Sequence, residues 1–377
     1  SSIGGSEATQ GIAGRTIRCS AGHNLQLSNI FGRQALKSMG LGGELEARML
    51  DEGVRMLILH EIGHTLGLNH NMKASQIYSI EQLADADFVA ENGLTGSVMD
   101  YAPVHLATPG RSQTGFYDVK PGPYDDWAIE FGYSPDLDGP DGEARRTALL
   151  NRSTEPLLTF GNDADDMRSP GSGIDPRVNI GDMSADAITY ASERLDLVDE
   201  MLGDLRARTG KEGESYQQLV NAYAVMSYEF AAAARTMSRY VGGVHVNRAM
   251  VDQPGAKTPL VPVALSDQKR AMAALRSKVF GPDAFSGSDD LYSHLRQQRR
   301  SFDFYGATED PKPHELILAV QKSVLDHLLL PVVRRRVSDS RQYGYQYAVG
   351  DVGEDLTNAL FSDDLPRSGN TDRLTRL

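Results

Sequence analysis

Hydrophobic residues recur along this chain mainly at spacings of three and four, which predicts helices. The pattern is helical over residues 25–39, stops at the glycine-rich stretch 40–43, and resumes at Glu44. Apolar positions keep the helical spacing as far as Ile62, so one long helix is expected in this stretch. Gly67 is placed to end that helix, because glycine adopts the left-handed conformation without a steric penalty.

The second half of the chain is predominantly helical in pattern. Helical spacing of apolar residues covers 185–207, 215–240, 266–279 and 314–336. Pro331 should kink or end the last of these helices, since proline lacks the amide hydrogen that a helix interior needs. A short hairpin is expected within 241–263. The stretch 134–182 is rich in Asp, Gly, Pro and Ser, which predicts a long irregular connection with a domain boundary in it or just after it.

Composition narrows the classes of function. The chain has 377 residues, a formal net charge of -13 and one cysteine, Cys19, so an intrachain disulfide is excluded. The basic residues are scattered apart from short clusters such as Arg334–Arg336, which we expect on a solvated helix face. Nucleic acid is therefore not an expected partner. No apolar run reaches the roughly 18 residues that a membrane-spanning helix needs, so no span is predicted.

A segment that begins at His60 and reads HEIGHTLGLNH carries the strongest chemical signal. His60 and His64 lie four residues apart on the predicted helix, so their imidazoles project from one face and can bind one ion. Glu61 is rotated around the helix from His60, which suits it to act on a metal-bound water. Gly67 lets the chain double back so that His70 becomes the third ligand. Three protein ligands leave one position open, which is typical of a catalytic zinc site.

The pattern H-E-x-x-H-x-x-G-x-x-H resembles that of the metzincin clan of zinc peptidases, which also has a methionine turn beneath the metal. The segment SVMDY, residues 97–101, resembles that turn. By this likeness Met99 underlies the zinc, and Tyr101 approaches the metal as a fifth ligand or as a stabiliser of the transition state. Without the likeness, Met99 would be a gap-filling core residue and Tyr101 an ordinary half-buried aromatic residue.

A closer likeness covers about residues 20–280. The stretches HEIGHTLGLNHNMKAS, SVMDYAP, GPYDDWAIEFGY and DPRVNIGDMSADAITYASERL together resemble the bacterial EcxA-like zinc-dependent metallopeptidases, whose zinc site is followed by a helical region. Such peptidases are usually exported, so the likeness implies an extracytoplasmic location, periplasmic or secreted. Members of the clan have a twisted sheet before the zinc helix that aligns an extended substrate. Here the residues before His60 read mostly as tail and helix, so that sheet either lies upstream of Ser1 or is missing.

These observations predict a mainly α fold, α+β overall. We expect a metzincin-like zinc-binding subdomain followed by a helical bundle, with the upstream sheet absent or incomplete. The expected divisions are a flexible tail over 1–16, the zinc-binding subdomain over 17–135, an irregular connection over 136–182, the helical C-terminal domain over 183–365 and a tail over 366–377.

Weaker signals leave alternatives open. A Gly/Pro-rich loop carries hard oxygen ligands that would suit Ca²⁺, or that form an ordinary solvated loop: Asp163, Asp165, Asp166 and Asp175. Cys19 is either an inhibitory thiolate for the zinc or an ordinary cysteine. Trp127 is expected to pack in the core behind the site. The other histidines lack metal-ligand spacing and are expected at the surface or as hydrogen-bonded core residues: His23, His105, His245, His294, His314 and His327.

The sequence therefore predicts a zinc-dependent endopeptidase in which Glu61 is the general base for hydrolysis of a peptide bond. The expected partner is a protein or peptide substrate, and an upstream part of the same polypeptide is a second candidate partner. The rival interpretation is a truncated or non-catalytic zinc-binding module that binds a polypeptide. Intact Glu61 favours the enzyme, because a binding module has no need of a general base. The missing sheet favours the binding module.

Overall fold

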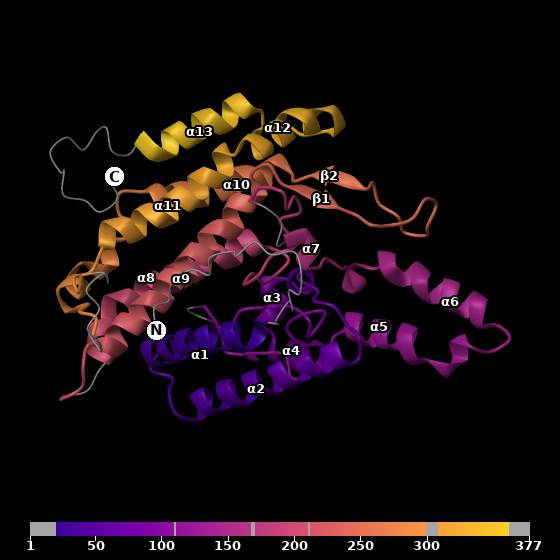
Figure 1. Ribbon diagram of the computed structural model, residues 1–377, viewed down its shortest axis with the longest axis horizontal. Helices are drawn as coiled ribbons and strands as arrows, with labels where there is room; N and C mark the ends of the chain where they lie inside the picture. Colours follow the sequence, from indigo (N-terminus) through magenta and orange to yellow (C-terminus); the bar gives the residue numbers. More distant parts are fainter. Residues whose placement is uncertain (1–19, 109–110, 167–169, 210–211, 299–307, 362–377) are drawn as a thin grey trace.

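The computed structural model describes residues 20–108, 111–166, 170–209, 212–298 and 308–361, and helices dominate it (Figure 1). The mainly α prediction is confirmed. A two-stranded antiparallel sheet pairs β1 (Val244–Val246) with β2 (Leu260–Pro262). The α-helices of the described residues are α1 (Ala21–Ser38), α2 (Glu44–Thr65), α3 (Ile80–Leu83), α4 (Ala86–Asn92), α5 (Pro123–Tyr133), α6 (Gly142–Asn151), α7 (Asp163–Asp166), α8 (Ala187–Arg208), α9 (Gln217–Tyr240), α10 (Leu265–Leu275), α11 (Pro313–Leu329), α12 (Pro331–Asp339) and α13 (Val349–Phe361).

The long helices are stacked in layers. Figure 1 shows α1 between α2 and the pair formed by α8 and α9, which α1 contacts. On the other side of that pair, α10 and α11 pack against α9, and α12 and α13 form the outermost layer. The shorter helices α5 and α6 project beyond one end of α2. The predicted metal ligands on α2 therefore lie in the layer opposite to α13.

Several predicted elements are found where the sequence pattern placed them. The proline break is one, because α11 ends at Leu329 and α12 begins at Pro331. The hairpin expected within 241–263 is the β1–β2 pair. The connection 136–182 is less irregular than predicted, since α6 lies inside it. The sequence GEARRTALLN of α6 is rich in strong helix formers, which outweigh the surrounding Gly and Pro.

One hydrophobic cluster connects the first helices with the later ones. It contains Phe31 of α1 and Phe116 together with residues of α8, α9, α10 and α11. Arg194 of α8 links the first helices to the later ones. Its guanidinium lies 4.0 Å from the Phe31 ring centroid of α1 and pairs with Glu229 of α9 at 3.0 Å. A buried ion pair of this kind fixes the packing of three helices in one arrangement. The division into a zinc-binding subdomain and a helical domain stays a prediction.

Apolar surface is exposed on α2. Val54, Ile58, Ile62 and Leu66 follow one another at intervals of four, so they form one face, and they are 53%, 53%, 47% and 40% exposed. In the described residues before α2, the regular structure is α1 alone, and none of these residues lies in a strand. No single helix in the described part of the chain is long and apolar enough to cross a membrane. Two consecutive helical segments of the described chain, Pro313–Leu329 and Pro331–Tyr343, meet that test when they are joined, with a bend between them.

Candidate metal centre

Three histidines converge at the end of α2. His60 and His64 project from one face of the helix, and His70 returns to them from the following turn. One ligand nitrogen from each of the three lies within 4.8 Å of the others. The Nε2 atoms of His64 and His70 are 3.0 Å apart. Among the described residues, this is the group of His, Cys, Asp and Glu side chains that could hold a metal ion.

A helix-ending turn brings His70 back to the helix. Gly67 has a φ of +88°, the left-handed conformation predicted for this position. Its amide donates to the His64 carbonyl at 3.0 Å, and the Leu68 amide donates to the Gly63 carbonyl at 3.0 Å. These two bonds satisfy carbonyls at the helix end that would otherwise lack partners, and they reverse the chain direction.

Asn71 holds the returned segment in place. Its backbone amide donates to the Met99 carbonyl at 3.0 Å. Its side chain donates to the Thr159 carbonyl at 2.9 Å and accepts from the Gly161 amide at 3.1 Å. The buried Asn71 thus joins three distant segments beside the third histidine.

Each histidine is oriented by an acceptor behind it. The Nδ1 atom of His60 lies 2.7 Å from the Val98 carbonyl, and that of His64 lies 3.0 Å from the Leu68 carbonyl. The Nδ1 atom of His70 lies 2.8 Å from the Asp163 carboxylate. These oxygens accept hydrogen bonds, so each Nδ1 carries the hydrogen and each Nε2 is left with a lone pair.

A shared cation would stabilise this tautomer. With hydrogens on the Nδ1 atoms, the Nε2 lone pairs of His64 and His70 face each other at 3.0 Å, and a positive ion bound by both removes their repulsion. Burial lowers the pKa of His60 to about 4, so its imidazole is neutral at pH 7, as a metal ligand must be. Three neutral nitrogens of this kind fit zinc.

The methionine turn packs directly beneath the helix that carries two of the ligands. Met99 is completely buried. A Cβ atom added at Gly63 would lie 2.3 Å from its Sδ atom, which is closer than any real contact. Gly63 stands between the two helical ligands, and the absence of a side chain there admits the sulfur. Sequence reasoning did not single out Gly63, although glycine inside a helix is itself a signal of close approach.

Asp125 of α5 shapes this turn. Its carboxylate accepts from the Ser97 hydroxyl at 2.5 Å, from the Val98 amide at 2.8 Å and from the Gly122 amide at 2.9 Å. Burial raises the pKa of this carboxyl group, whereas these three bonds oppose the rise. Because Val98 also accepts the bond from His60, Asp125 acts on the ligand through one intervening residue. No local sequence pattern indicates this role for Asp125.

Tyr101 and Glu61 lie beside the histidines. The Tyr101 hydroxyl is 3.0 Å from the Nε2 atom of His70, and it accepts from the Ser20 amide at 3.0 Å. The phenol ring is buried, so the hydroxyl is held at the face where a metal would bind. Glu61 is exposed to solvent, and its charge raises the pKa of His60 slightly against the effect of burial. The roles assigned to Tyr101 and Glu61 stay predictions.

The sequence matches a known protein family. The family model described as Met-zincin covers residues 43–367. The chain belongs to the Met-zincin family. The match runs from the residue before α2 beyond α13, so it includes both the histidines and the later helices. Comparisons with curated proteins and with solved structures found no significant match.

Membership of the Met-zincin family confirms the predicted likeness to the metzincin clan and implies zinc at the histidine cluster. The closer likeness to EcxA-like peptidases stays a prediction. The structure gives calcium no support, because the acidic side chains of the predicted loop have other partners. Asp163 faces His70, Asp165 pairs with Arg248, and Asp175 holds Lys73 and Arg177. Cys19 and the side chain of Asp166 lie outside the described residues.

Other predicted residues of this Met-zincin chain lie away from the metal centre. Trp127 is half-buried on α5 and donates to the Leu149 carbonyl at 2.9 Å. His105 and His327 are core histidines, as expected, and each ring forms one hydrogen bond with the backbone, at Leu83 and at Ser238 respectively. The Nδ1 atoms of His105 and His327 are buried and have no hydrogen-bond partner among the described residues. His105 lies in the core, and His327 lines a cavity.

Proposed function

We propose that this chain is a zinc-dependent endopeptidase whose metal is held by His60, His64 and His70. The observation that carries the proposal is the cluster itself: one ligand nitrogen of each histidine lies within 4.8 Å of the others, and an acceptor at each Nδ1 orients the rings. Membership of the Met-zincin family supports the same conclusion. A zinc ion at this point would lower the pKa of a coordinated water and polarise the carbonyl of a peptide bond.

Glu61 serves as the proton carrier in this proposal. Its carboxylate accepts a proton from the attacking water as the water oxygen bonds to the carbonyl carbon. It then transfers that proton to the amine nitrogen as the carbon–nitrogen bond breaks, so that one water is consumed for each bond cleaved. The exposure of Glu61 allows water and substrate to reach it.

Tyr101 serves as the hydrogen-bond donor to the carbonyl oxygen. Negative charge develops on that oxygen during attack, and a buried hydroxyl fixed in advance stabilises it by about 3 kcal/mol. The backbone bond from Ser20 and the packing of the ring against His70 hold the hydroxyl in position. Tyr101 would therefore affect the rate of hydrolysis more than the binding of substrate.

Substitution Glu61→Gln tests the assignment of the general base. Hydrolysis of casein and of fluorogenic peptides should fall by about 100- to 10,000-fold, because the amide cannot accept the proton. Zinc content, measured by mass spectrometry, should stay at one ion per chain. Glu315→Gln, at an exposed position on α11, is the matched control and should retain full activity. Undiminished hydrolysis by a zinc-loaded Glu61→Gln protein would refute the assignment.

The rival function is polypeptide binding without catalysis. The exposed apolar face of α2 at Val54, Ile58 and Ile62 favours it, since such a face beside the metal centre suits contact with another polypeptide. This function predicts zinc binding with no hydrolysis by the wild-type chain. An extracytoplasmic location, implied by the likeness to exported bacterial peptidases, belongs to the proposal as well. Cell fractionation would test it.

A further inference from the structure

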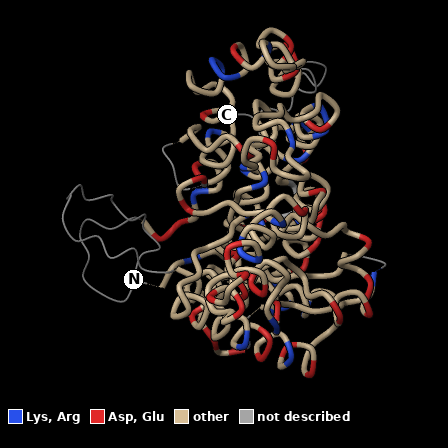
Figure 2. Tube along the Cα trace, turned by 90° about the vertical axis from the view of Figure 1, so that its right-hand side faces the viewer, with Lys and Arg blue, Asp and Glu red and all other residues tan. Residues whose placement is uncertain are grey.

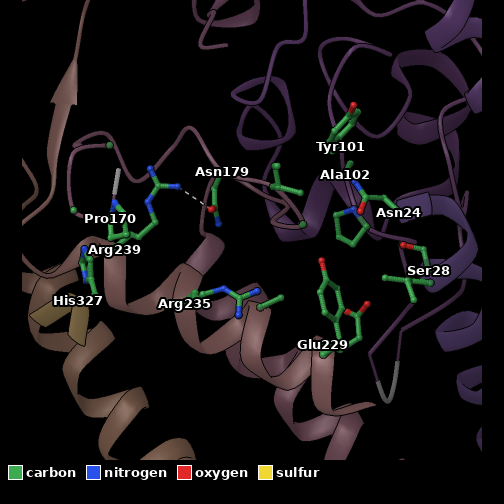
Figure 3. Close-up of a pocket in the computed structure, with 18 residues that line it drawn as sticks. Asn24, Ser28, Tyr101, Ala102, Pro170, Asn179, Glu229, Arg235, Arg239 and His327 are labelled. Atoms are coloured by element: carbon green, nitrogen blue, oxygen red, sulfur yellow. Dashed lines mark hydrogen bonds between the residues drawn. The ribbon is translucent and has the colours of Figure 1, made fainter. Parts of the chain in front are cut away.

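A cavity of about 370 Å³ opens between α1, α9, α11 and the loop that precedes α8 (Figure 3). Tyr101 and Glu229 lie toward one end of it, Arg239 and His327 toward the other, and Arg235 between them. We call it the Arg235 cavity. Its volume is in the range of small-ligand sites. The Gly181 amide donates to the Tyr101 carbonyl at 3.1 Å, so the cavity wall and the metal centre share Tyr101.

Arg235 presents an uncompensated positive charge to this cavity. Among the described residues, no carboxylate pairs with its guanidinium, and Tyr228 is the neighbour that acts on its charge. Arg235 is exposed to solvent, and the protein that covers part of its side chain lowers its pKa. A guanidinium that faces a cavity and pairs with no carboxylate is open to an anion, which it can bind through charge-assisted hydrogen bonds.

Neighbouring arginines add to the positive charge. Arg239, one turn along α9, donates to the Asn179 side-chain oxygen at 2.8 Å and to the Asp175 carbonyl at 3.1 Å. Arg336 was expected on a solvated face but is half-buried, because it donates to the carbonyls of Gly242 at 2.8 Å and Gly171 at 2.7 Å. The acceptors of Arg336 are neutral oxygens, so they leave its positive charge in place.

The acidic residue of the cavity does not neutralise this end. Glu229 lies toward α1 (Figure 3) and is paired with the buried Arg194 at 3.0 Å. Elsewhere the acidic and basic side chains are interspersed along the chain (Figure 2), which carries a net charge of -13. The concentration of guanidinium groups at one end of a cavity is therefore a local feature that opposes the overall charge.

His327 contributes a neutral ring to the wall of the cavity. Burial, together with the charges of Arg239 and Arg336, lowers the pKa of His327 to about 4, so the ring is neutral at pH 7. A bond to the Ser238 carbonyl leaves Nδ1 as an acceptor, and no described residue donates to this buried atom. A peptide carboxylate would supply the anion that Arg235 lacks, whereas the Nδ1 atom of His327 is buried and out of reach of a ligand.

We propose that the Arg235 cavity is a subsite for a carboxylate group of the peptide substrate, and that Arg235 is the residue that selects it. This inference rests on the proposed peptidase function. The planar guanidinium fork binds a carboxylate through two parallel hydrogen bonds, which gives specificity over a neutral amide. A peptide that extends from the metal centre past Tyr101 would place an acidic side chain or its C-terminal carboxylate in the cavity.

Paired fluorogenic peptides test the inference. Each pair differs only by Glu or Gln at one position, and four positions on each side of the cleaved bond are scanned. A further pair differs by a free or an amidated C-terminus, which separates the two sources of the carboxylate. For the wild-type chain, kcat/KM should be at least about tenfold higher for the acidic member of one pair.

Variants of Arg235 identify the residue responsible. Arg235→Gln should remove the preference while kcat/KM for the neutral peptide changes less than about twofold, and Arg235→Lys should retain part of it. Arg334→Gln, at an exposed position on α12, is the matched control and should keep the full preference. Thermal melts identify any variant that fails to fold. A preference that is absent in the wild type, or unchanged in folded Arg235→Gln, would overturn the inference.

Binding separates this inference from the peptidase function. The anisotropy of fluorescein-labelled members of each pair is measured with the Glu61→Gln protein, which needs no turnover. Tighter binding of the acidic member, lost when Arg235→Gln is added, supports the Arg235 cavity even if no peptide is hydrolysed. Equal affinity for both members of every pair would refute the cavity assignment, whatever the result for hydrolysis.

Discussion

The metal centre and the Arg235 cavity meet at Tyr101 but are built in opposite ways. In the metal centre, each ring nitrogen that faces away from the cluster has an acceptor, and the three remaining lone pairs converge. In the Arg235 cavity, a guanidinium and a histidine nitrogen lack partners among the described residues. The first region is suited to a cation, and the second presents a guanidinium suited to an anion. The proposed substrate would use both, with its peptide bond at the first and a carboxylate at the second.

Removal of the carboxylate behind His70 should affect the metal centre alone. In Asp163→Asn, zinc affinity should fall by about 10- to 100-fold, because the ring loses a charged acceptor that fixes its orientation and basicity. Competition with a fluorescent chelator measures this change. Asp165→Asn is the matched control, since Asp165 pairs with Arg248 instead. A drop in zinc affinity of the same size in both variants would contradict the role given to Asp163.

A methyl group at Gly63 should disturb the contact between α2 and Met99. Gly63→Ala should lower the free energy of unfolding by about 1–3 kcal/mol, because its Cβ would overlap the buried sulfur. Urea unfolding of the metal-free protein measures the change. Gly203→Ala on α8 is the matched control: nothing lies within 4 Å of the added carbon, and helix propensity predicts a gain of up to about 1 kcal/mol. Equal stabilisation of both variants would rule out the packing account.

Acid should reveal the environment of His327 in the Arg235 cavity. Its folded pKa of about 4 lies below the unfolded value of about 6.5, so between these values the unfolded chain takes up a proton that the folded chain does not. Stability is therefore lost as the pH falls through this window, by about 2 kcal/mol at pH 5. Urea unfolding at pH 7 and pH 5 should show a smaller loss for His327→Gln than for the wild type. The same loss in both proteins would mean that His327 titrates normally.

The parts of the molecule that depend on local chemistry could be predicted from the sequence. Gly67 ends α2 because of its own backbone freedom, and Pro331 breaks the α11–α12 stretch because of its missing hydrogen. The histidine cluster was predictable because two ligands lie one helical turn apart and a glycine turn returns the third. Each of these depends on residues within a few positions of one another.

The parts that depend on distant contacts could not be predicted. From the sequence, Asp163 is either a calcium ligand or part of a solvated loop, because no local pattern indicates that it meets His70, 93 residues earlier in the chain. Asp125 approaches the methionine turn from a different helix. The Arg235 cavity combines α1, α9 and α11, and the inward position of Arg336 depends on carbonyls of two remote loops. Only the folded chain shows which polar groups are left without partners.

X-ray absorption at the zinc K-edge tests the central claim most directly. For the purified zinc-loaded protein, we expect three imidazole nitrogens at about 2.0–2.1 Å and one oxygen ligand from water. His70→Ala should reduce the imidazole count by one. A spectrum with sulfur or carboxylate ligands in place of the histidines, or one unchanged in His70→Ala, would contradict the claim that His60, His64 and His70 form a catalytic zinc site.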